Sequence, residues 1–297
     1  MPAPGTEKIS YLQAVTVGLL QGVTELFPIS SLGHSVLLPA LIGGSWGRLV
    51  TQEHLNESPY LAFLVGVHVA TALALLLYYR HTWLRIIKGF FASLGKRRLD
   101  TPDERLAWLL ICVTIPVGII GLALEHTLRT IFARPTAAAV FLFCNGLIML
   151  AGEYVRRRSL VRQADEHRPL ETLELKEAGA IGLGQSLALL AGISRSGVTM
   201  VAGLLRGLDH EDAARFSFLA ATPIILAAGL YKLPDLLGAN GDGVRGQVLA
   251  GSVVAAVAAF FSVRFLERFF RTRTLTPFGI YSLIVGAGCF VRFGLVG

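Results

Sequence analysis

The sequence predicts an all-α polytopic membrane protein, with six transmembrane helices and two re-entrant helical hairpins arranged as an inverted-topology repeat. Of its 297 residues 53% are hydrophobic and only 16% are charged, and the mean hydropathy is +0.60. Soluble domains carry about 25% charged residues, so a soluble fold is excluded. The net charge of +7 does not indicate a nucleic-acid partner, because the Lys and Arg residues lie in short loops between apolar segments.

Six apolar segments are close to the roughly 20 residues that cross a bilayer. They comprise residues 60–80, 106–124, 137–153, 213–231, 246–264 and 277–296. Two further apolar regions, 11–43 and 177–205, are interrupted by Pro28, Gly33 and Gly192 among polar residues. Irregular backbone at membrane depth is tolerated only where protein or a water-filled cavity covers it. We therefore expect each region to be a re-entrant hairpin that enters the bilayer and returns.

The distribution of Lys and Arg among the loops supports this arrangement of six spans and two hairpins. Basic residues concentrate in three loops, at residues 80–105, 154–176 and 264–273, and the other loops are poorer in Lys and Arg. All three rich loops fall on one side of the membrane only if neither hairpin crosses it. The positive-inside rule makes that side cytoplasmic. The first hairpin then enters from outside and the second from inside, as an inverted repeat requires.

The two polar clusters also resemble each other. When Gln21 is aligned with Gln185, two similar stretches superimpose: Ile29-Ser30-Ser31-Leu32-Gly33-His34-Ser35 and Ile193-Ser194-Arg195-Ser196-Gly197-Val198-Thr199. We therefore predict one integral membrane domain over 1–297, with repeats at 11–153 and 177–296 and a basic cytoplasmic linker at 154–176.

The first cluster combines a carboxylate, hydroxyl groups and an imidazole. Gln21 and Glu25 are four residues apart and share one helix face. Ser30 and Ser31 are natural N-caps for the helix that follows, and His34 lies about one turn along that helix. Because ionisable residues inside a membrane are costly, this cluster is predicted to be functional.

The second cluster is suited to binding an anion. Gly192 permits a turn, Ser194 can cap the next helix, and Arg195, Ser196 and Thr199 lie in its first turns. Free backbone N–H groups, hydroxyls and a guanidinium together favour phosphate. One hairpin thus offers a base or nucleophile and the other a phosphate clamp, which is most of what phosphoryl transfer requires.

Other interpretations of the same residues stay open at this point. Arg195 could pair with Glu25 for structural reasons alone, since a buried ion pair needs no substrate. His68, alone on an apolar span, is predicted to be structural, and Asn145 to hydrogen-bond between helices. The alternative function is a secondary transporter or flippase of a phosphorylated lipid or other anion, because such proteins also use inverted repeats and midplane polar residues.

Together the motifs resemble those of the undecaprenyl-diphosphate phosphatases of the bacitracin-resistance protein family. That family carries (E/Q)xxxE followed by PxSSxGH, and here the residues are Gln21-x-x-x-Glu25 and Pro28-Ile-Ser30-Ser31-Leu-Gly33-His34. Its second motif, PGxSRSGxT, appears as Ala191-Gly192-Ile-Ser194-Arg195-Ser196-Gly197-Val-Thr199. Gln21 stands where many members have Glu, and Ala191 replaces the proline. The resemblance covers nearly the whole chain.

The resemblance implies an enzyme that hydrolyses undecaprenyl diphosphate to the monophosphate, recycling the lipid carrier for peptidoglycan and cell-wall synthesis and conferring bacitracin resistance. It implies a multi-pass protein of the bacterial inner membrane, with the active site facing the outer, periplasmic side. Its expected partners are the prenyl diphosphate lipid and membrane lipids, with no nucleic acid. A homodimer stays open, because apolar helix faces look alike towards lipid and towards a second copy.

The site residues follow from the matched motifs. The predicted catalytic residues are Glu25, Ser31, His34 and Arg195. The predicted substrate-binding residues are Gln21, Ser30, Ser194, Ser196 and Thr199. Arg195 is expected to clamp the diphosphate. Glu25 with Gln21 is expected either to hold a divalent cation, Mg²⁺ or Ca²⁺, or to position the attacking group. The nucleophile is left open between Ser31, His34 and water.

Overall fold

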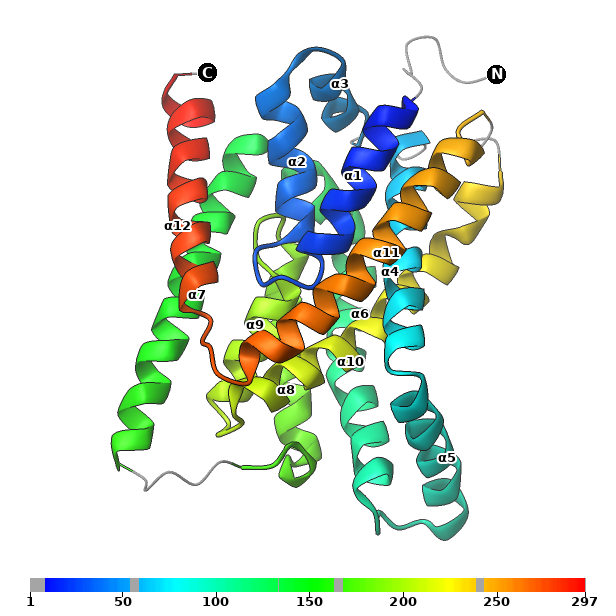
Figure 1. Cartoon of the computed structure of the whole chain (residues 1–297), viewed down its shortest axis with the longest axis vertical. Helices are drawn as coiled ribbons and strands as arrows, with labels where there is room; N and C mark the ends of the chain where they lie inside the picture. The colour runs from blue at the N-terminus through cyan, green and yellow to red at the C-terminus, as the bar shows by residue number, and fades with distance from the viewer. Residues whose placement is uncertain (1–8, 54–58, 133, 163–167, 239–242, 297) are drawn as a thin grey trace.

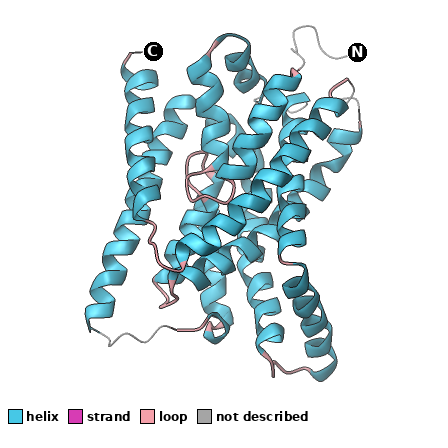
Figure 2. Ribbon diagram, viewed as in Figure 1, coloured by secondary structure: helices cyan, strands magenta, loops and turns pink. Residues whose placement is uncertain are grey.

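The computed structural model describes the chain except for residues 1–8, 54–58, 133, 163–167, 239–242 and 297. Within the described ranges the protein consists of helices and loops, with no strand (Figure 2). The all-α fold is confirmed. Part of the predicted linker, residues 163–167, lies outside the described residues.

The predicted spans correspond to long helices. In the described part of the chain, five helices are long and apolar enough to cross a membrane. They belong to α6 (Pro102–Phe132), α7 (Pro135–Arg162), α10 (His210–Leu237), α11 (Arg245–Phe270), and α12 (Thr276–Phe290) with its continuation η4 (Val291–Leu295). A sixth is counted if α4 (Pro59–Tyr78) and α5 (Arg80–Lys96), which meet at a bend of 85°, form one span.

The segment of α5 was predicted to be part of a loop and is instead an amphipathic helix. Ile86, Gly89 and Ser93 are buried, and α5 packs against α6. Apolar side chains on its other face are exposed, namely Leu84, Ile87, Phe91 and Leu94. A basic helix with one exposed apolar stripe is typical of the membrane interface. The Lys and Arg residues that predict the orientation of the protein in the membrane therefore also belong to a helix.

Two short helix pairs correspond to the predicted hairpins. The first pair is α1 (Tyr11–Thr24) and α2 (Ser31–Ile42), and the second is α8 (Leu175–Gln185), followed by η2 (Ser186–Leu189), and α9 (Arg195–Leu204). The 14 residues of α1 rise about 21 Å, less than the roughly 30 Å of a hydrocarbon core. In Figure 1 the first pair lies in the half of the molecule that carries both termini, and the second pair lies in the opposite half. Each pair reverses direction inside the molecule.

The two pairs pack reciprocally. Helix α1 packs along α11, and α8 packs along α6. Gly18 and Gly182 occupy equivalent positions in the Gln21–Gln185 alignment, and at each a Cβ would overlap a backbone carbonyl of the neighbouring helix, that of Gly251 or of Val113. Such close approach requires glycine. Each hairpin thus packs on a helix from the other half of the chain, an arrangement typical of an inverted repeat; the repeat boundaries stay predictions.

The basic segments gather at one end of the molecule. Figure 1 shows α5, the end of α7 and the start of α8 at the end opposite the termini. After the undescribed stretch, the chain is held at this end by Arg168, which donates to Glu177 at 2.7 Å, and by Leu170 N–H, which donates to Asp212 at 2.9 Å. The residues leading into α8 are therefore anchored to the bundle.

Candidate active site

The break in the first hairpin is fixed by Ser30. Its φ of 69° is unusual for a residue other than glycine, so the surroundings must hold it. The Ser30 hydroxyl oxygen accepts from the N–H of Gly33 and from the N–H of Gly192, both at 3.2 Å, and its carbonyl accepts from Nδ1 of His34 at 2.8 Å. Because Gly192 belongs to the second hairpin, the conformation of Ser30 is set by both hairpins together.

Ser194 fixes the break in the second hairpin, together with Asn145 of α7. Its hydroxyl oxygen caps α9 by accepting from Gly197 N–H at 3.1 Å. Its own N–H donates to the side-chain oxygen of Asn145 at 2.9 Å, and the Asn145 amide donates to the carbonyl of Pro28 at 3.0 Å. Asn145 therefore joins both hairpin breaks, which confirms its predicted role as a hydrogen-bonding residue between helices.

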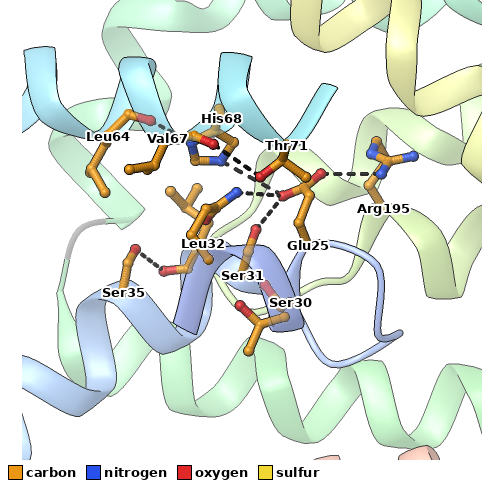
Figure 3. Close-up of polar contacts among 12 residues, drawn as sticks. Glu25, Ser30, Ser31, Leu32, Ser35, Leu64, Val67, His68, Thr71 and Arg195 are labelled. Atoms are coloured by element: carbon orange, nitrogen blue, oxygen red, sulfur yellow. Dashed lines mark hydrogen bonds and ion pairs between the residues drawn. The ribbon is translucent and has the colours of Figure 1, made fainter. Parts of the chain in front are cut away.

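Glu25 is the centre of the polar contacts where the hairpins meet (Figure 3). Its Oε1 accepts from Arg195 at 3.1 Å, while its Oε2 accepts from the hydroxyl of Ser31 at 2.6 Å and from the amide of Gln21 at 3.2 Å. Arg195 also donates to the carbonyl of Ser217 on α10, at 3.2 Å. Glu25 is only 8% exposed, so the guanidinium compensates a carboxylate that would be costly alone.

His68, for which a structural role is predicted, lies beside this cluster. Its Nδ1 donates to the carbonyl of Leu64, one turn earlier on α4, at 2.7 Å. Its Nε2 lies 3.7 Å from Oε2 of Glu25, and Figure 3 shows the ring directed towards the carboxylate. The general cost of an ionisable side chain in a membrane span was the signal that could have identified it.

His34, unlike His68, has its side-chain contacts with Ser30 and Tyr281 and not with Glu25. Its Nδ1 reaches back to the Ser30 carbonyl, and its Nε2 accepts from the hydroxyl of Tyr281 at 2.8 Å, with the two rings stacked. It is not among the described residues lining the cavity beside Glu25. The bonds to the Ser30 carbonyl and the Tyr281 hydroxyl fix the direction of the ring.

The remaining predicted residues divide into two groups. Ser30, Ser31 and Ser194 line the cavity. Ser196 and Thr199 are fully buried: the Ser196 hydroxyl donates to the carbonyl of Phe27 at 3.3 Å, and Thr199 donates to Oε1 of Gln185 at 2.9 Å. These two hydroxyls join segments of the hairpins.

A cavity of about 320 Å³ opens beside Glu25. Glu25, Ser31, His68, Gln185 and Arg195 form its polar end. Its apolar wall consists of Leu64, Val65, Val117, Leu189, Ile193, Ile224, Ile225 and Ala228. This combination suits a ligand with a charged head and an apolar chain.

Two donors at the polar end lack partners. Among the described residues, Nε2 of Gln185 and Nε of Arg195 are buried side-chain nitrogens without a hydrogen bond. The oxygen of the Gln185 amide lies 2.9 Å from the Thr199 hydroxyl, which also bonds the Arg195 carbonyl at 2.7 Å. The NH₂ group of Gln185 is left to donate elsewhere. Unsatisfied buried donors are costly, and an anion with several oxygens could accept from both.

Comparison with known proteins identifies relatives of the whole chain. The family model described as "Bacitracin resistance protein BacA" matches residues 14–288. The chain belongs to the BacA family. Undecaprenyl-diphosphatase 2 of Frankia alni is 56% identical over 97% of this chain and 99% of its own. Undecaprenyl-diphosphatase of Mycolicibacterium paratuberculosis is 55% identical over 98% of this chain and 99% of its own. Undecaprenyl-diphosphatase 2 of Chromobacterium violaceum is 44% identical over 93% of this chain and 96% of its own.

In the described part of this BacA-family protein, the side chains do not by themselves provide a metal centre. The described residues contain no group of three or more His, Cys, Asp or Glu side chains placed to hold an ion. Glu25 is engaged on both oxygens by Arg195, Ser31 and Gln21, and Gln21 directs its N–H rather than its oxygen towards Glu25. The predicted pair of Glu25 and Gln21 is thus a poor fit to a resident cation.

Proposed function

We propose that this protein hydrolyses undecaprenyl diphosphate to undecaprenyl phosphate and inorganic phosphate. The observation that carries the proposal is the cavity whose lining contains Arg195, Glu25 and Ser31 together with mostly apolar side chains. A polyprenyl chain suits the apolar wall, and a diphosphate suits the polar end. The curated relatives are named undecaprenyl-diphosphatase, which agrees with this chemistry.

Arg195 and Gln185 are proposed to hold the terminal phosphate. Among the described residues that line the cavity, Arg195 and Gln185 have buried donors without a partner, at Nε and Nε2. A guanidinium neutralises the charge that develops on a transferred phosphoryl group. Arg195 is kept in position by Glu25 and the Ser217 carbonyl. The clamp is therefore preorganised before the substrate enters.

Among the three predicted nucleophiles, the geometry favours Ser31. Its hydroxyl donates to Oε2 of Glu25 at 2.6 Å, within the range for a nucleophile and its base. The Ser31 proton passes to Glu25 while the Oγ–P bond forms. The bond from the terminal phosphorus to the bridging oxygen breaks, and undecaprenyl phosphate leaves with the electron pair. The product of this step is a phosphoserine.

A divalent cation, Mg²⁺ or Ca²⁺, is proposed to enter with the substrate. Magnesium is usually bound through substrate phosphates with few protein carboxylates, which agrees with the poor fit of Glu25 and Gln21 to a resident ion. Bound to the diphosphate, the cation would supply charge neutralisation. Removal of the cation by a chelator should then raise KM for the diphosphate without unfolding the protein.

The proposed location is the bacterial inner membrane, with the cavity open to the outer side. The cavity extends from Glu25 to Lys232 near the end of α10, away from the basic segments that the positive-inside rule assigns to the cytoplasm. At that side the enzyme would return the lipid carrier to cell-wall synthesis. The homodimer stays a prediction, measurable by sedimentation in detergent.

The function is tested by phosphate release. Purified protein in detergent, supplied with undecaprenyl diphosphate and Mg²⁺ or Ca²⁺, is expected to release inorganic phosphate and undecaprenyl monophosphate in equal amounts. A transporter or flippase of the same lipid would release neither. Absence of release with both cations would overturn the proposed function.

A further inference from the structure

His68 lies outside both hairpins, yet its position gives it a defined chemical state. The Nδ1–H group donates to the Leu64 carbonyl at 2.7 Å. This bond fixes the tautomer of the neutral ring, so that Nε2 carries the lone pair. A ring anchored in this way by its own helix can accept a proton at one known atom.

The lone pair of His68 faces the reacting groups. The side chain is 27% exposed and lines the cavity together with Ser31 and Arg195. Its Nε2 is 3.7 Å from Oε2 of Glu25, too far for a hydrogen bond. Since Glu25 Oε2 already accepts from Ser31 and Gln21, Nε2 is left to accept a proton from a molecule in the cavity.

Glu25 cannot perform both proton transfers that a phosphoserine mechanism requires. After Ser31 attacks, Glu25 holds the serine proton, and the departing phosphate monoester is a stable anion that needs no proton to leave. When water attacks the phosphoserine, Ser31 must regain that proton from Glu25 as the P–Oγ bond breaks. A second group must accept the proton of the water at the same time.

We propose that His68 is the general base for the water that hydrolyses the phosphoserine on Ser31, an inference that rests on the proposed function. The water oxygen forms a bond to phosphorus and gives its proton to Nε2 of His68. The bond between phosphorus and the Ser31 oxygen breaks, and Glu25 returns the proton to that oxygen. Inorganic phosphate leaves, and the imidazolium releases its proton to solvent through the cavity.

The test is a rapid-quench experiment with undecaprenyl diphosphate labelled on its terminal phosphate. The H68Q variant keeps an N–H group of similar reach but has no basic nitrogen. It should release about one equivalent of undecaprenyl monophosphate per enzyme in a burst, retain the label on the protein, and turn over about 10²- to 10⁴-fold more slowly than wild type. The matched control is H81Q, because His81 is exposed on α5 and outside the cavity; it should behave as wild type.

A second variant separates catalysis from folding. H68A leaves space next to the cavity, so added imidazole should restore phosphate release and discharge the labelled protein, which a purely structural role would not allow. Wild-type turnover in H68Q, or slow turnover without labelled protein, would overturn the role of His68 alone. Absence of phosphate release by wild type would instead overturn the proposed function and this inference with it.

Discussion

The guanidinium of Arg195 and the carboxylate of Glu25 are joined by a 3.1 Å hydrogen bond, although 170 residues separate them in the sequence. Each residue belongs to a different hairpin, and neither hairpin could bury its own charge alone at acceptable cost. The pair therefore depends on both hairpins being inserted together. It also leaves Nε of Arg195 without a partner at the end of a cavity.

The R195K variant is predicted to lose activity although the positive charge is kept. Lysine cannot bond Glu25 and the Ser217 carbonyl simultaneously in the planar geometry of Arg195. Phosphate-release kinetics should show kcat/KM reduced by about 10²- to 10³-fold, the usual effect of one missing donor to a developing charge. The control is R206K, at a residue just beyond α9 and outside the cavity. Equal activity of R195K and R206K would remove Arg195 from the site.

S31A is predicted to lose both turnover and covalent labelling. The hydroxyl of Ser31 is the group hydrogen-bonded to Glu25, so its loss should lower kcat by about 10³-fold or more. The matched control is S35A on the same helix, whose hydroxyl donates to the Leu32 carbonyl. Trapping of labelled phosphate on S31A, or near-normal kcat, would show that another nucleophile acts.

His34 is predicted to act by holding Ser30 rather than by chemistry at phosphorus. Asparagine can reproduce the donor at Nδ1 that bonds the Ser30 carbonyl, whereas alanine cannot. H34N should therefore keep about fivefold more activity than H34A, the factor expected for one net hydrogen bond of about 1 kcal/mol. If both variants are equally inactive, the imidazole of His34 takes part in the reaction.

The hairpins and their meeting point could be predicted because their signals are local. Pro28 and Gly192 mark the breaks, and polar residues flank each break within a few positions. Loop charge then predicted that the two hairpins enter from opposite sides. The contact of Glu25 with Arg195 followed from two clusters that were each too costly to leave in lipid.

The cost of an ionisable group in a span singles out His68, but the directions in which the His68 and Gln185 side chains point could not be predicted from local signals. Each is a polar residue whose effect depends on how far its helix is rotated, and rotation is set by packing between distant segments. The direction of the His34 ring likewise depends on its bond to the Ser30 carbonyl, within a backbone conformation that both hairpins hold. The helix α5 was not predicted because its many Lys and Arg residues indicated a loop, although its apolar residues are spaced as on one face of a helix.

The close packing of α8 against α6 predicts opposite effects of two alanine substitutions on one helix. At Gly182 a Cβ would overlap the Val113 carbonyl, whereas at Gly179 it would meet nothing within 4 Å. G182A should destabilise the protein by about 1–3 kcal/mol through overpacking. G179A should stabilise it by up to about 1 kcal/mol through helix propensity. Thermal unfolding in detergent measures both; a lower melting temperature for G179A than for G182A would contradict the packing.

Acid should weaken the anchor between Arg168 and Glu177 at the basic end. The hydrogen bond from Arg168, at 2.7 Å, lowers the pKa of Glu177 below its ordinary value of 4.5. A carboxylate with a depressed pKa contributes stability above the pKa of the unfolded chain, and this stability is lost as pH falls through the folded value. E177Q lacks the titrating group, so its melting temperature should fall less than that of wild type as pH is lowered from about 6 to 3.

The control for this prediction is E211Q, which removes an exposed pair with Arg271. Exposed pairs contribute little to stability, so E211Q should lose melting temperature on acidification as wild type does. The difference between the two variants separates the effect of the partly buried Arg168–Glu177 pair from general acid unfolding. If E177Q and wild type lose the same melting temperature over this range, Arg168 does not stabilise the start of α8 through the charge of Glu177.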